Sequence, residues 1–376
     1  MGCSALPEEI IPFNLQLILK INFPQSFSGI HKLRKKKIGI LYEDSLLIYS
    51  SNNFSKINHI EMDRNEILKF LDIKKVKDYY DNYYTSPEFN DFIEMKDSDL
   101  VLCAYKMILF YKLYGKEYKL NQVIGRNYEI NSLYELSNGN LVSCGSFGME
   151  IYYKIKVTNE YILLSKHNIS EKYEYHFGYK MLGVLKIIEI KLNELIILKR
   201  YCKLRRCSRD SSFSDYSISI YNIDNKNEKI LTSLHVSDDF IGITYMNYLI
   251  KNEYLFVRYG YKLDIYNIKN NVKLINKSNK TFETQEVEFE GIFGPIKRVV
   301  TQLKKEFNIV FLSNFDDFIF VKDINDIIKI YTFRNNRLKF YQTIPFQNKD
   351  INGIINLKNN NLLMYTSKEL FIFKHL

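Results

Sequence analysis

Two clusters of basic side chains are the parts of this sequence whose residue types and spacing can do chemistry. The first cluster spans residues 32–37 and the second spans residues 203–209. Guanidinium and ammonium groups bind carboxylates and phosphates, so both clusters predict contacts with an acidic protein, a phosphorylated group or an anionic lipid. The alternative is that both are solvated loops. The residues expected to contact a partner are Arg34, Lys35, Lys36, Lys37, Lys203, Arg205, Arg206 and Arg209.

The first residues of the chain form a candidate lipid-attachment site. The sequence Met-Gly-Cys-Ser is typical of myristate on Gly2 and palmitate on Cys3. The pattern departs at position six, where Leu6 replaces the usual serine or threonine. The alternative is that Gly2 and Cys3 are incidental residues of a short tail.

The sequence contains no arrangement of residues that predicts catalysis, a metal or a cofactor. None of the six histidines shares a metal-ligand spacing with another, and there is no Gly-rich phosphate loop, Gly-x-Ser-x-Gly or Cys-x-x-Cys. The five scattered cysteines suggest reduced thiols. Two of them, Cys103 and Cys144, lie in apolar runs and are predicted core residues.

A repeated phrase indicates which elements must position the basic loops. Seven times along the chain, an alternating strand ends in an apolar residue followed by an aromatic one. Three of the intervals between copies lie near the roughly 40–45 residues of a four-stranded blade, and the other three are longer. The copies are Ile48-Tyr49, Phe110-Tyr111, Tyr152-Tyr153, Ile220-Tyr221, Ile265-Tyr266, Ile330-Tyr331 and Ile372-Phe373.

The longer intervals predict insertions at about 62–90, 203–215 and 281–307. In the first insertion, Asp63 and Glu66 form a capping pair that predicts a helix. In the third, Pro295 can open a helix, because the apolar residues after it fall on one helical face. The second insertion is polar, rich in serine, and predicted to be a loop that partners or phosphorylation can reach.

The repeat units resemble those of WD40-like propellers. Each combines a strand, an Asn/Gly turn, a second strand of small residues and a third strand ending in the apolar–aromatic phrase, as in residues 130–153. The Gly-His and Trp-Asp signatures of that family are missing, so aromatic packing must hold the blades. The resemblance implies an all-β fold, a single seven-bladed propeller with short helical insertions, over residues 14–376. Leu204-Arg205-Arg206 also resembles the paired-arginine motif of phosphoinositide-binding propellers, with Cys207 where glycine is expected.

The N-terminal strand is predicted to close the ring. The last unit has only three strands before the chain ends, whereas residues 14–22 form a strand-like segment without a partner of its own. By the resemblance, this segment pairs beside the third strand of the last blade. Residues 1–13 are then expected to be a flexible tail.

Composition favours a binding protein over an enzyme. Hydrophobic residues make up 46% of the chain, enough for a core, and the formal charge is +10. No secretory signal or membrane-spanning run is present, so a soluble, cytoplasmic protein is expected. The first hypothesis is a protein-interaction scaffold in a larger assembly. The first alternative is a peripheral membrane propeller that binds phosphoinositide or anionic lipid through its basic loops, and the second is a propeller enzyme. Neither nucleic acid nor a small-molecule substrate is expected.

Overall fold

The computed structural model describes most of the chain in segments. They are residues 15–70, 89–169, 179–203, 215–234, 246–251, 254–259, 262–267, 273–276, 282–291, 294–303, 311–315, 318–322, 327–334, 337–344, 351–357 and 361–375. The chain divides into two compact units: residues 26–247 form one, and residues 1–25 together with 248–376 form the other.

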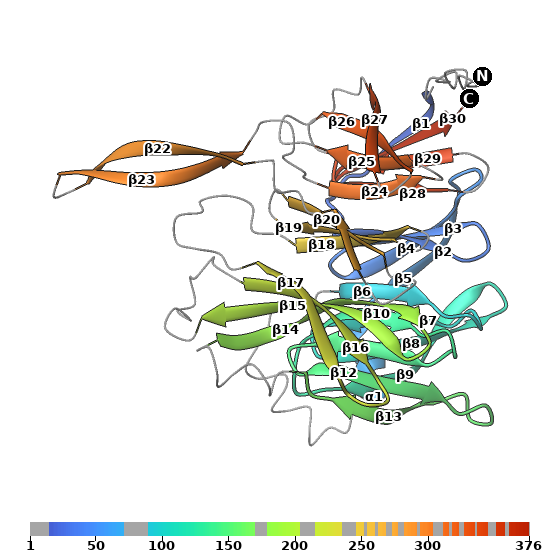
Figure 1. Cartoon of the computed structure of the whole chain (residues 1–376). Helices are drawn as coiled ribbons and strands as arrows, with labels where there is room; N and C mark the ends of the chain where they lie inside the picture. The colour runs from blue at the N-terminus through green and yellow to red at the C-terminus, as the bar shows by residue number, and fades with distance from the viewer. Residues whose placement is uncertain are drawn as a thin grey trace, which may run out of the picture. The chain divides into compact units, whose positions relative to one another are not determined.

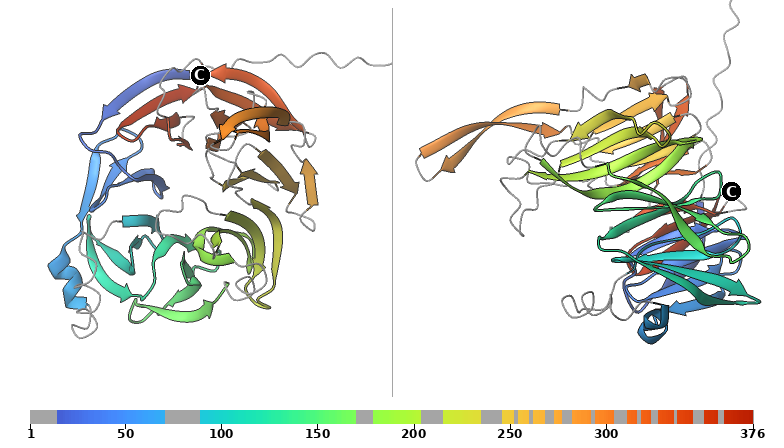
Figure 2. Two further views of the ribbon diagram at one scale, coloured as in Figure 1. Left: turned by 90° about the vertical axis from the view of Figure 1, so that its left-hand side faces the viewer. Right: turned by 90° about the horizontal axis from the view of Figure 1, so that it is seen from below.

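Residues 26–247 fold into four antiparallel sheets of four strands each, and successive sheets lie side by side (Figures 1 and 2). Sheet 1 contains β2 (Gly29–Leu33), β3 (Lys37–Leu41), β4 (Ser45–Ser50) and β5 (Lys56–Glu61). Sheet 2 contains β6 (Phe89–Glu94), β7 (Leu100–Ala104), β8 (Met107–Tyr114) and β9 (Glu117–Gly125). Sheet 3 contains β10 (Ile130–Glu135), β11 (Leu141–Gly145), β12 (Gly148–Lys154) and β13 (Tyr161–His167). Sheet 4 contains β14 (Tyr179–Lys191), β15 (Glu194–Lys203), β16 (Asp215–Asn222) and β17 (Glu228–Leu234).

The other unit contains three more four-stranded sheets and a two-stranded ribbon among its described residues. Sheet 5 contains β18 (Met246–Lys251), β19 (Tyr254–Tyr259), β20 (Lys262–Asn267) and β21 (Lys273–Asn276). The ribbon is β22 (Phe282–Gly291) and β23 (Gly294–Leu303). Sheet 6 contains β24 (Phe311–Phe315), β25 (Phe318–Lys322), β26 (Ile328–Arg334) and β27 (Arg337–Ile344). Sheet 7 contains β28 (Gly353–Asn356), β29 (Asn361–Tyr365), β30 (Glu369–His375) and β1 (Leu15–Asn22). The all-β propeller expected from the sequence is therefore confirmed.

The strand predicted to complete the last unit lies where the sequence placed it. β1 pairs antiparallel with β30, with Leu15 opposite His375 and Asn22 opposite Glu369. The partly exposed Leu15 packs against the core shared by sheets 6 and 7. The first and last strands that the structure describes are thus hydrogen-bonded in one sheet.

The apolar–aromatic phrase marks the same structural position throughout the chain. Each aromatic lies opposite an apolar residue of the second strand of its sheet, as Tyr111 does opposite Leu100. The phrase lies on the third strand of each sheet. In six of the seven four-stranded sheets described, the fourth strand has a β-bulge opposite the two residues of the phrase. In sheet 4 the irregularity lies between Ile218 and Ser219, two residues earlier. A bulge increases the local twist, so the phrase marks the point where each outer strand bends.

The third copy of the phrase was assigned one residue too late. The residue opposite Leu141 is Tyr152, which is fully buried, whereas Tyr153 is 36% exposed. The phrase in sheet 3 is therefore Ile151-Tyr152. Two consecutive tyrosines satisfy the sequence pattern equally well, and only the pleat decides which one points into the core.

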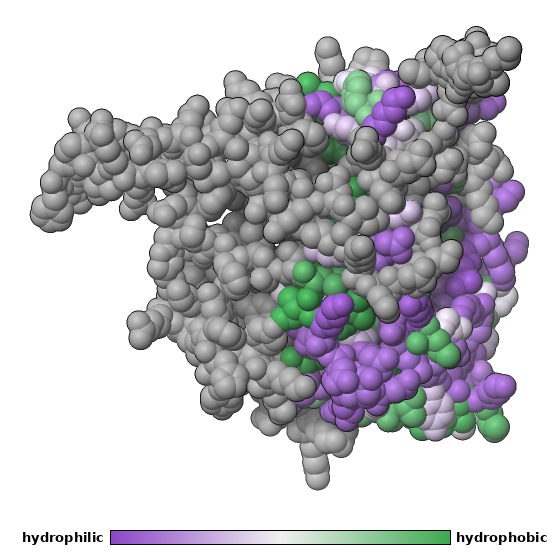
Figure 3. Space-filling view, in the orientation of Figure 1, coloured by the Kyte–Doolittle hydropathy of each residue, from purple (hydrophilic) through white to green (hydrophobic). Residues whose placement is uncertain are grey.

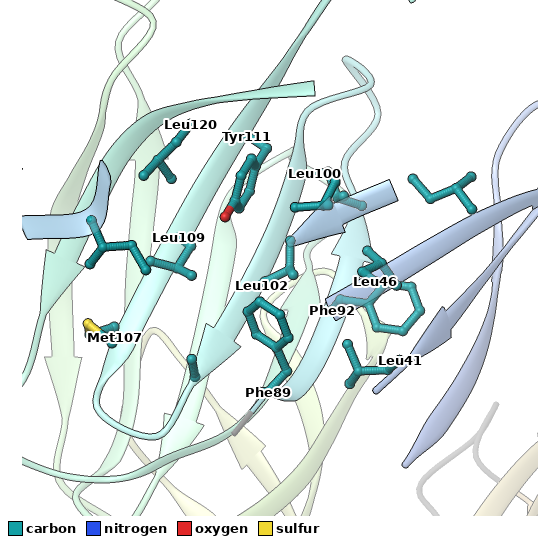
Figure 4. Packing of buried hydrophobic residues seen from close by; sticks show 14 of the residues in the cluster. Leu41, Leu46, Phe89, Phe92, Leu100, Leu102, Met107, Leu109, Tyr111 and Leu120 are labelled. Atoms are coloured by element: carbon teal, nitrogen blue, oxygen red, sulfur yellow. The ribbon is translucent and has the colours of Figure 1, made fainter. Parts of the chain in front are cut away.

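Apolar side chains from neighbouring sheets form the cores. Between sheets 1 and 2, Leu41 and Leu46 meet Phe92 and Leu102 (Figure 4). Gly39 makes this packing possible, because a Cβ at that position would lie 2.3 Å from the Phe92 ring. Both faces of the inner strands are covered, as expected for sheets stacked between other sheets.

The insertions agree with the sequence in one case and correct it in another. Helix α1 (Arg64–Phe70) begins as predicted at Asp63, whose carboxylate accepts the backbone N–H of Asn65 at 2.8 Å and of Glu66 at 3.2 Å. The helix predicted after Pro295 is wrong, since that segment is the second strand of the β22–β23 ribbon. The Glu-x-Glu alternation of residues 286–290, the turn at Gly291–Gly294 and the β-branched Val299, Val300 and Thr301 favour strands over a helix.

Candidate interaction site

The first basic cluster forms a tight hairpin between β2 and β3. Its two central residues, Lys35 and Lys36, have φ angles of 52° and 60°, and the Lys37 N–H donates to the Arg34 carbonyl at 3.2 Å. Positive φ angles at both central residues of a β-turn are the conformation that Asn-Gly adopts most readily. An ordinary side chain in this region costs roughly 1–2 kcal/mol per residue. The tip of this hairpin is therefore strained.

The two residues that flank the tip are held by carboxylates of the next sheets. The Arg34 N–H donates to Glu94 Oε2 at 2.5 Å, and Arg34 Nη2 donates to Glu135 Oε2 at 2.9 Å. Lys37 Nζ forms an ion pair with the fully buried carboxylate of Glu94 and donates to the Tyr118 hydroxyl at 3.1 Å. These contacts fix the base of the hairpin and neutralise both flanking charges.

The electrostatics of Lys37 fit this structural role. Burial acts to lower the pKa of Lys37, but the hydrogen bonds that its ammonium makes to Glu94 and Tyr118 outweigh burial and raise the pKa. Lys37 is thus held in its charged form by its partners. Four residues of this cluster were predicted to contact a partner. Two of them, Arg34 and Lys37, form ion pairs with carboxylates of the protein itself.

The two remaining lysines of the cluster are exposed. Lys35 and Lys36 protrude at the tip of a hairpin whose base is fixed, and neighbouring Lys32 is exposed as well. A pair of adjacent ammonium groups on a rigid turn can accept carboxylates or phosphates without ordering a flexible loop first. The chemistry that this site offers is recognition of acidic groups.

The carboxylates that hold the hairpin belong to a repeated structural arrangement that was not predicted from the sequence. Glu94, Glu135 and Glu189 occupy equivalent positions on the first strands of sheets 2, 3 and 4. Each is paired with a leucine of the second strand, and that leucine is paired on its other side with the aromatic residue of the phrase. Each accepts a backbone N–H from the first turn of the preceding sheet. The donors are Arg34 to Glu94 at 2.5 Å, Lys96 to Glu135 at 2.8 Å and Ser137 to Glu189 at 2.6 Å. The recurrence of Glu just before three successive turns was a signal that could have revealed it.

The second basic cluster contributes only one described residue. Lys203 is the last residue of β15, and β16 resumes at Asp215, so the predicted insertion lies between the second and third strands of sheet 4. Arg205, Arg206 and Arg209 lie outside the described residues, as do Gly2 and Cys3.

The first strands of sheets 1 to 3 bring together a histidine, an acid and a serine that the sequence does not place together. Asp91 accepts the Ser132 hydroxyl at 2.8 Å and the Leu133 N–H at 2.9 Å, and its other oxygen lies 3.6 Å from His31 Nε2. The carboxylate stands between the serine and the histidine. Because the hydroxyl donates to a carboxylate and not to an imidazole, this order does not activate Ser132 as a nucleophile. The hydrogen bonds that Asp91 accepts instead join neighbouring sheets.

Other groups with potential chemistry are core residues. Cys103 and Cys144 are buried free thiols, as predicted, and burial raises the pKa of both. Within the described ranges, no group of three or more His, Cys, Asp or Glu side chains is placed to hold a metal ion. No helix among the described residues has the length and hydropathy needed to cross a membrane.

The comparisons with known proteins identify the fold. No protein-family model matches the chain, and no curated protein sequence matches it. Among solved structures, the chain is similar to the WD40 β-propeller domain of Doa1, with a TM-score of 0.52, 11% identity and coverage of 96% of this chain and 97% of that one. It is similar to a chain of the mitotic checkpoint complex, with a TM-score of 0.58, 10% identity and coverage of 100% and 97%.

A third similar structure is that of Saccharomyces cerevisiae Sqt1, with a TM-score of 0.53, 10% identity and coverage of 96% of this chain and 99% of that one. At these identities the likeness concerns the fold alone. It agrees with the repeat, the four-stranded sheets and the pairing of β1 with β30. The chain has the fold of the WD40 β-propellers.

Proposed function

We propose that this protein is a non-catalytic scaffold, a seven-bladed propeller that binds an acidic segment of a protein partner through the tip of its β2–β3 hairpin. The fold supports the scaffold, since one similar structure is that of a complex and propellers offer rigid sheets with variable loops. The exposed lysines at the hairpin tip support the acidic partner. The insertion at 203–215, with Arg205, Arg206 and Arg209, is proposed as a second contact region.

The seven blades and the closure of the ring are part of this proposal. Seven four-stranded sheets among the described residues support the blade count. The pairing of β1 with β30 supports closure, because it supplies the fourth strand that sheet 7 otherwise lacks. A closed ring removes the open edge that would invite aggregation and gives the loops a rigid base.

The single observation that carries the proposed function is the strained conformation of Lys35 and Lys36. Turns that adopt two positive φ angles are built at lowest cost from Asn-Gly, and sheet 3 has Gly139, with a φ of 87°, in the turn between its first two strands. Sheet 1 instead holds two exposed lysines there. Backbone strain of this kind concentrates at functional sites, and the side chains kept at this cost are cations.

Replacement of the tip should separate stability from binding. The double variant Lys35→Asn/Lys36→Gly is expected to raise the free energy of unfolding by about 1 kcal/mol, because the new residues fit the turn. The same variant should weaken binding of a fluorescent poly-glutamate peptide about tenfold, since each lost exposed ion pair contributes up to about 1 kcal/mol. Fluorescence anisotropy at low and high ionic strength measures the binding, and chemical denaturation measures the stability.

Lys226→Gly is the matched control. Lys226 is also exposed and left-handed, with a φ of 56°, but it lies in the turn between β16 and β17. It is compared with the single variant Lys36→Gly. Both glycine variants should raise the free energy of unfolding, but Lys226→Gly should leave peptide affinity unchanged. If both glycine variants weaken binding equally, the peptide responds to net charge alone and the hairpin is not the site.

A further inference from the structure

Strand β1 exposes an apolar run that its place at the edge of sheet 7 does not explain. Leu17, Ile18 and Leu19 are 49%, 54% and 37% exposed. Ile18 is the extra residue of the bulge, since Leu17 pairs with Phe373 and Leu19 pairs with Ile372. Edge strands are normally protected by charged residues or proline, and no charged residue interrupts this run.

A second exposed hydrophobic residue lies on the adjoining sheet of the same unit. Phe340, on β27 of sheet 6, is 53% exposed. Sheets 6 and 7 share one core, in which Ile330 and Ile344 pack with Leu362 and Phe373. β27 and β1 are the fourth strands of these two sheets, and Figure 3 shows hydrophobic and hydrophilic side chains side by side near β26 and β27. We call the exposed residues of β1, β27 and β30 the rim of this unit.

Exposed lysines lie among the apolar side chains of the rim. Strands β1, β27 and β30 contain one acid, Glu369, which pairs with Lys20 at 2.7 Å. Lys339 is exposed next to Phe340, and Lys374 is exposed opposite Gln16 of β1. The exposed lysines of these three strands are Lys20, Lys339 and Lys374. The rim thus combines exposed aliphatic and aromatic side chains with more lysines than acids.

The residue types decide between a membrane and a protein as the occupant. Protein interfaces are depleted in lysine and enriched in arginine and aromatic residues, and leucine rarely contributes a binding hot spot. The leucines and lysines of the rim differ from that composition, whereas Phe340 is compatible with either occupant. Surfaces that bind anionic bilayers insert apolar side chains at the headgroup boundary and attract acidic lipids with lysines.

We propose that the rim, formed by Leu17, Ile18, Leu19, Phe340 and the lysines beside them, docks this protein on an anionic lipid bilayer. The aliphatic side chains of the β1 bulge enter the headgroup region, and Lys339 and Lys374 contact lipid phosphates and carboxylates. The rim shares no residue with the β2–β3 hairpin, so each proposal can fail without the other.

Flotation with vesicles tests the rim. The full chain should float with vesicles of phosphatidylcholine and phosphatidylserine, float less with phosphatidylcholine alone, and be released by salt. The triple variant Leu17→Ser/Ile18→Ser/Leu19→Ser should lose at least about tenfold in partitioning. Lys339→Gln and Lys374→Gln should each lose about fivefold, because a lysine near an anionic surface contributes about 1 kcal/mol. All of these side chains are exposed, so the thermal midpoint should stay unchanged.

A triple variant on another outer strand provides the matched control. Ile162, Leu163 and Leu164 of β13 are 37%, 38% and 56% exposed, close to the values on β1. Their replacement by serine should leave flotation unchanged, and so should Lys35→Asn/Lys36→Gly. The proposal is overturned if the full chain fails to float with anionic vesicles, if the β13 variant loses as much as the β1 variant, or if neither loses. Capture of a protein by the rim in a chain that ignores vesicles would assign the rim to a protein partner instead.

Discussion

Removal of residues 1–23 is expected to leave a chain that unfolds easily and aggregates, whereas removal of residues 1–13 leaves the fold intact. The longer deletion takes away β1, which contributes seven residue pairs to sheet 7. At about 0.5–1.5 kcal/mol for each net hydrogen bond and about one bond per residue pair, roughly 4–10 kcal/mol of stability is lost. The deletion also uncovers the edge of β30, whose residues 370–373 are all buried hydrophobics, and such an edge recruits other chains.

The two truncations are compared by thermal denaturation and by size-exclusion chromatography. The shorter truncation keeps every described residue of the fold and should elute and melt like the full chain. Equal stability and equal solubility of the two truncations would mean that β1 is dispensable and that it does not close the ring.

Tyr152→Ala is expected to be the most damaging single substitution, at about 3–5 kcal/mol. Tyr152 is fully buried in the core between sheets 2 and 3, so removal of its ring would leave a cavity. Its hydroxyl donates to the buried Glu150 carboxylate and accepts from Arg126 Nε at 3.0 Å. Tyr152→Phe keeps the ring and loses only the hydroxyl contacts, so it should cost about 1–2 kcal/mol.

Tyr153→Ala is the control for this substitution, since the neighbouring ring is 36% exposed and should cost less than about 1 kcal/mol. Urea denaturation of the three variants orders them directly. Similar losses for Tyr152→Ala and Tyr153→Ala would show that the aromatic of the repeated phrase is not the residue that packs between the sheets.

The repeat was predictable because it rests on strand periodicity and aromatic packing. The phrase at Ile265-Tyr266 and its counterparts recur where the third strand of each sheet meets an apolar second strand, and alternation alone detects such strands. The pairing of β1 with β30 was predictable for a similar reason, because residues 15–22 read as a strand and the last unit lacks a fourth strand of its own. The assignment failed only at Tyr152-Tyr153, where two identical residues leave the register open.

The β22–β23 ribbon was not predictable from the signals used. Pro295 and the spacing of Ile296, Val299 and Val300 satisfy a helical pattern, but β-branched residues satisfy a strand pattern as well. The pairing that decides between the two comes from residues 282–291 on the other strand of the ribbon. Interactions between strands are invisible when one segment is read alone.

The candidate site was predictable as a position but not as a set of roles. The cluster at residues 34–37 was found from its charge, which does not distinguish a cation that pairs inside the protein from one that faces solvent. Arg34 and Lys37 reach Glu94 and Glu135, which lie 60 and 101 residues from Arg34 in the chain. Only the packing of successive sheets brings these carboxylates to the hairpin and leaves Lys35 and Lys36 exposed.

The claim that this propeller is a scaffold whose hairpin tip holds its partner is tested most directly by quantitative affinity purification from the native cell. Wild type and Lys226→Gly should capture the same proteins, and proteins with acidic segments should be lost from Lys35→Asn/Lys36→Gly. Since the tip variant is expected to fold at least as stably as wild type, such a loss reports on binding and not on folding. Capture of an identical set of proteins by all three chains would contradict the claim.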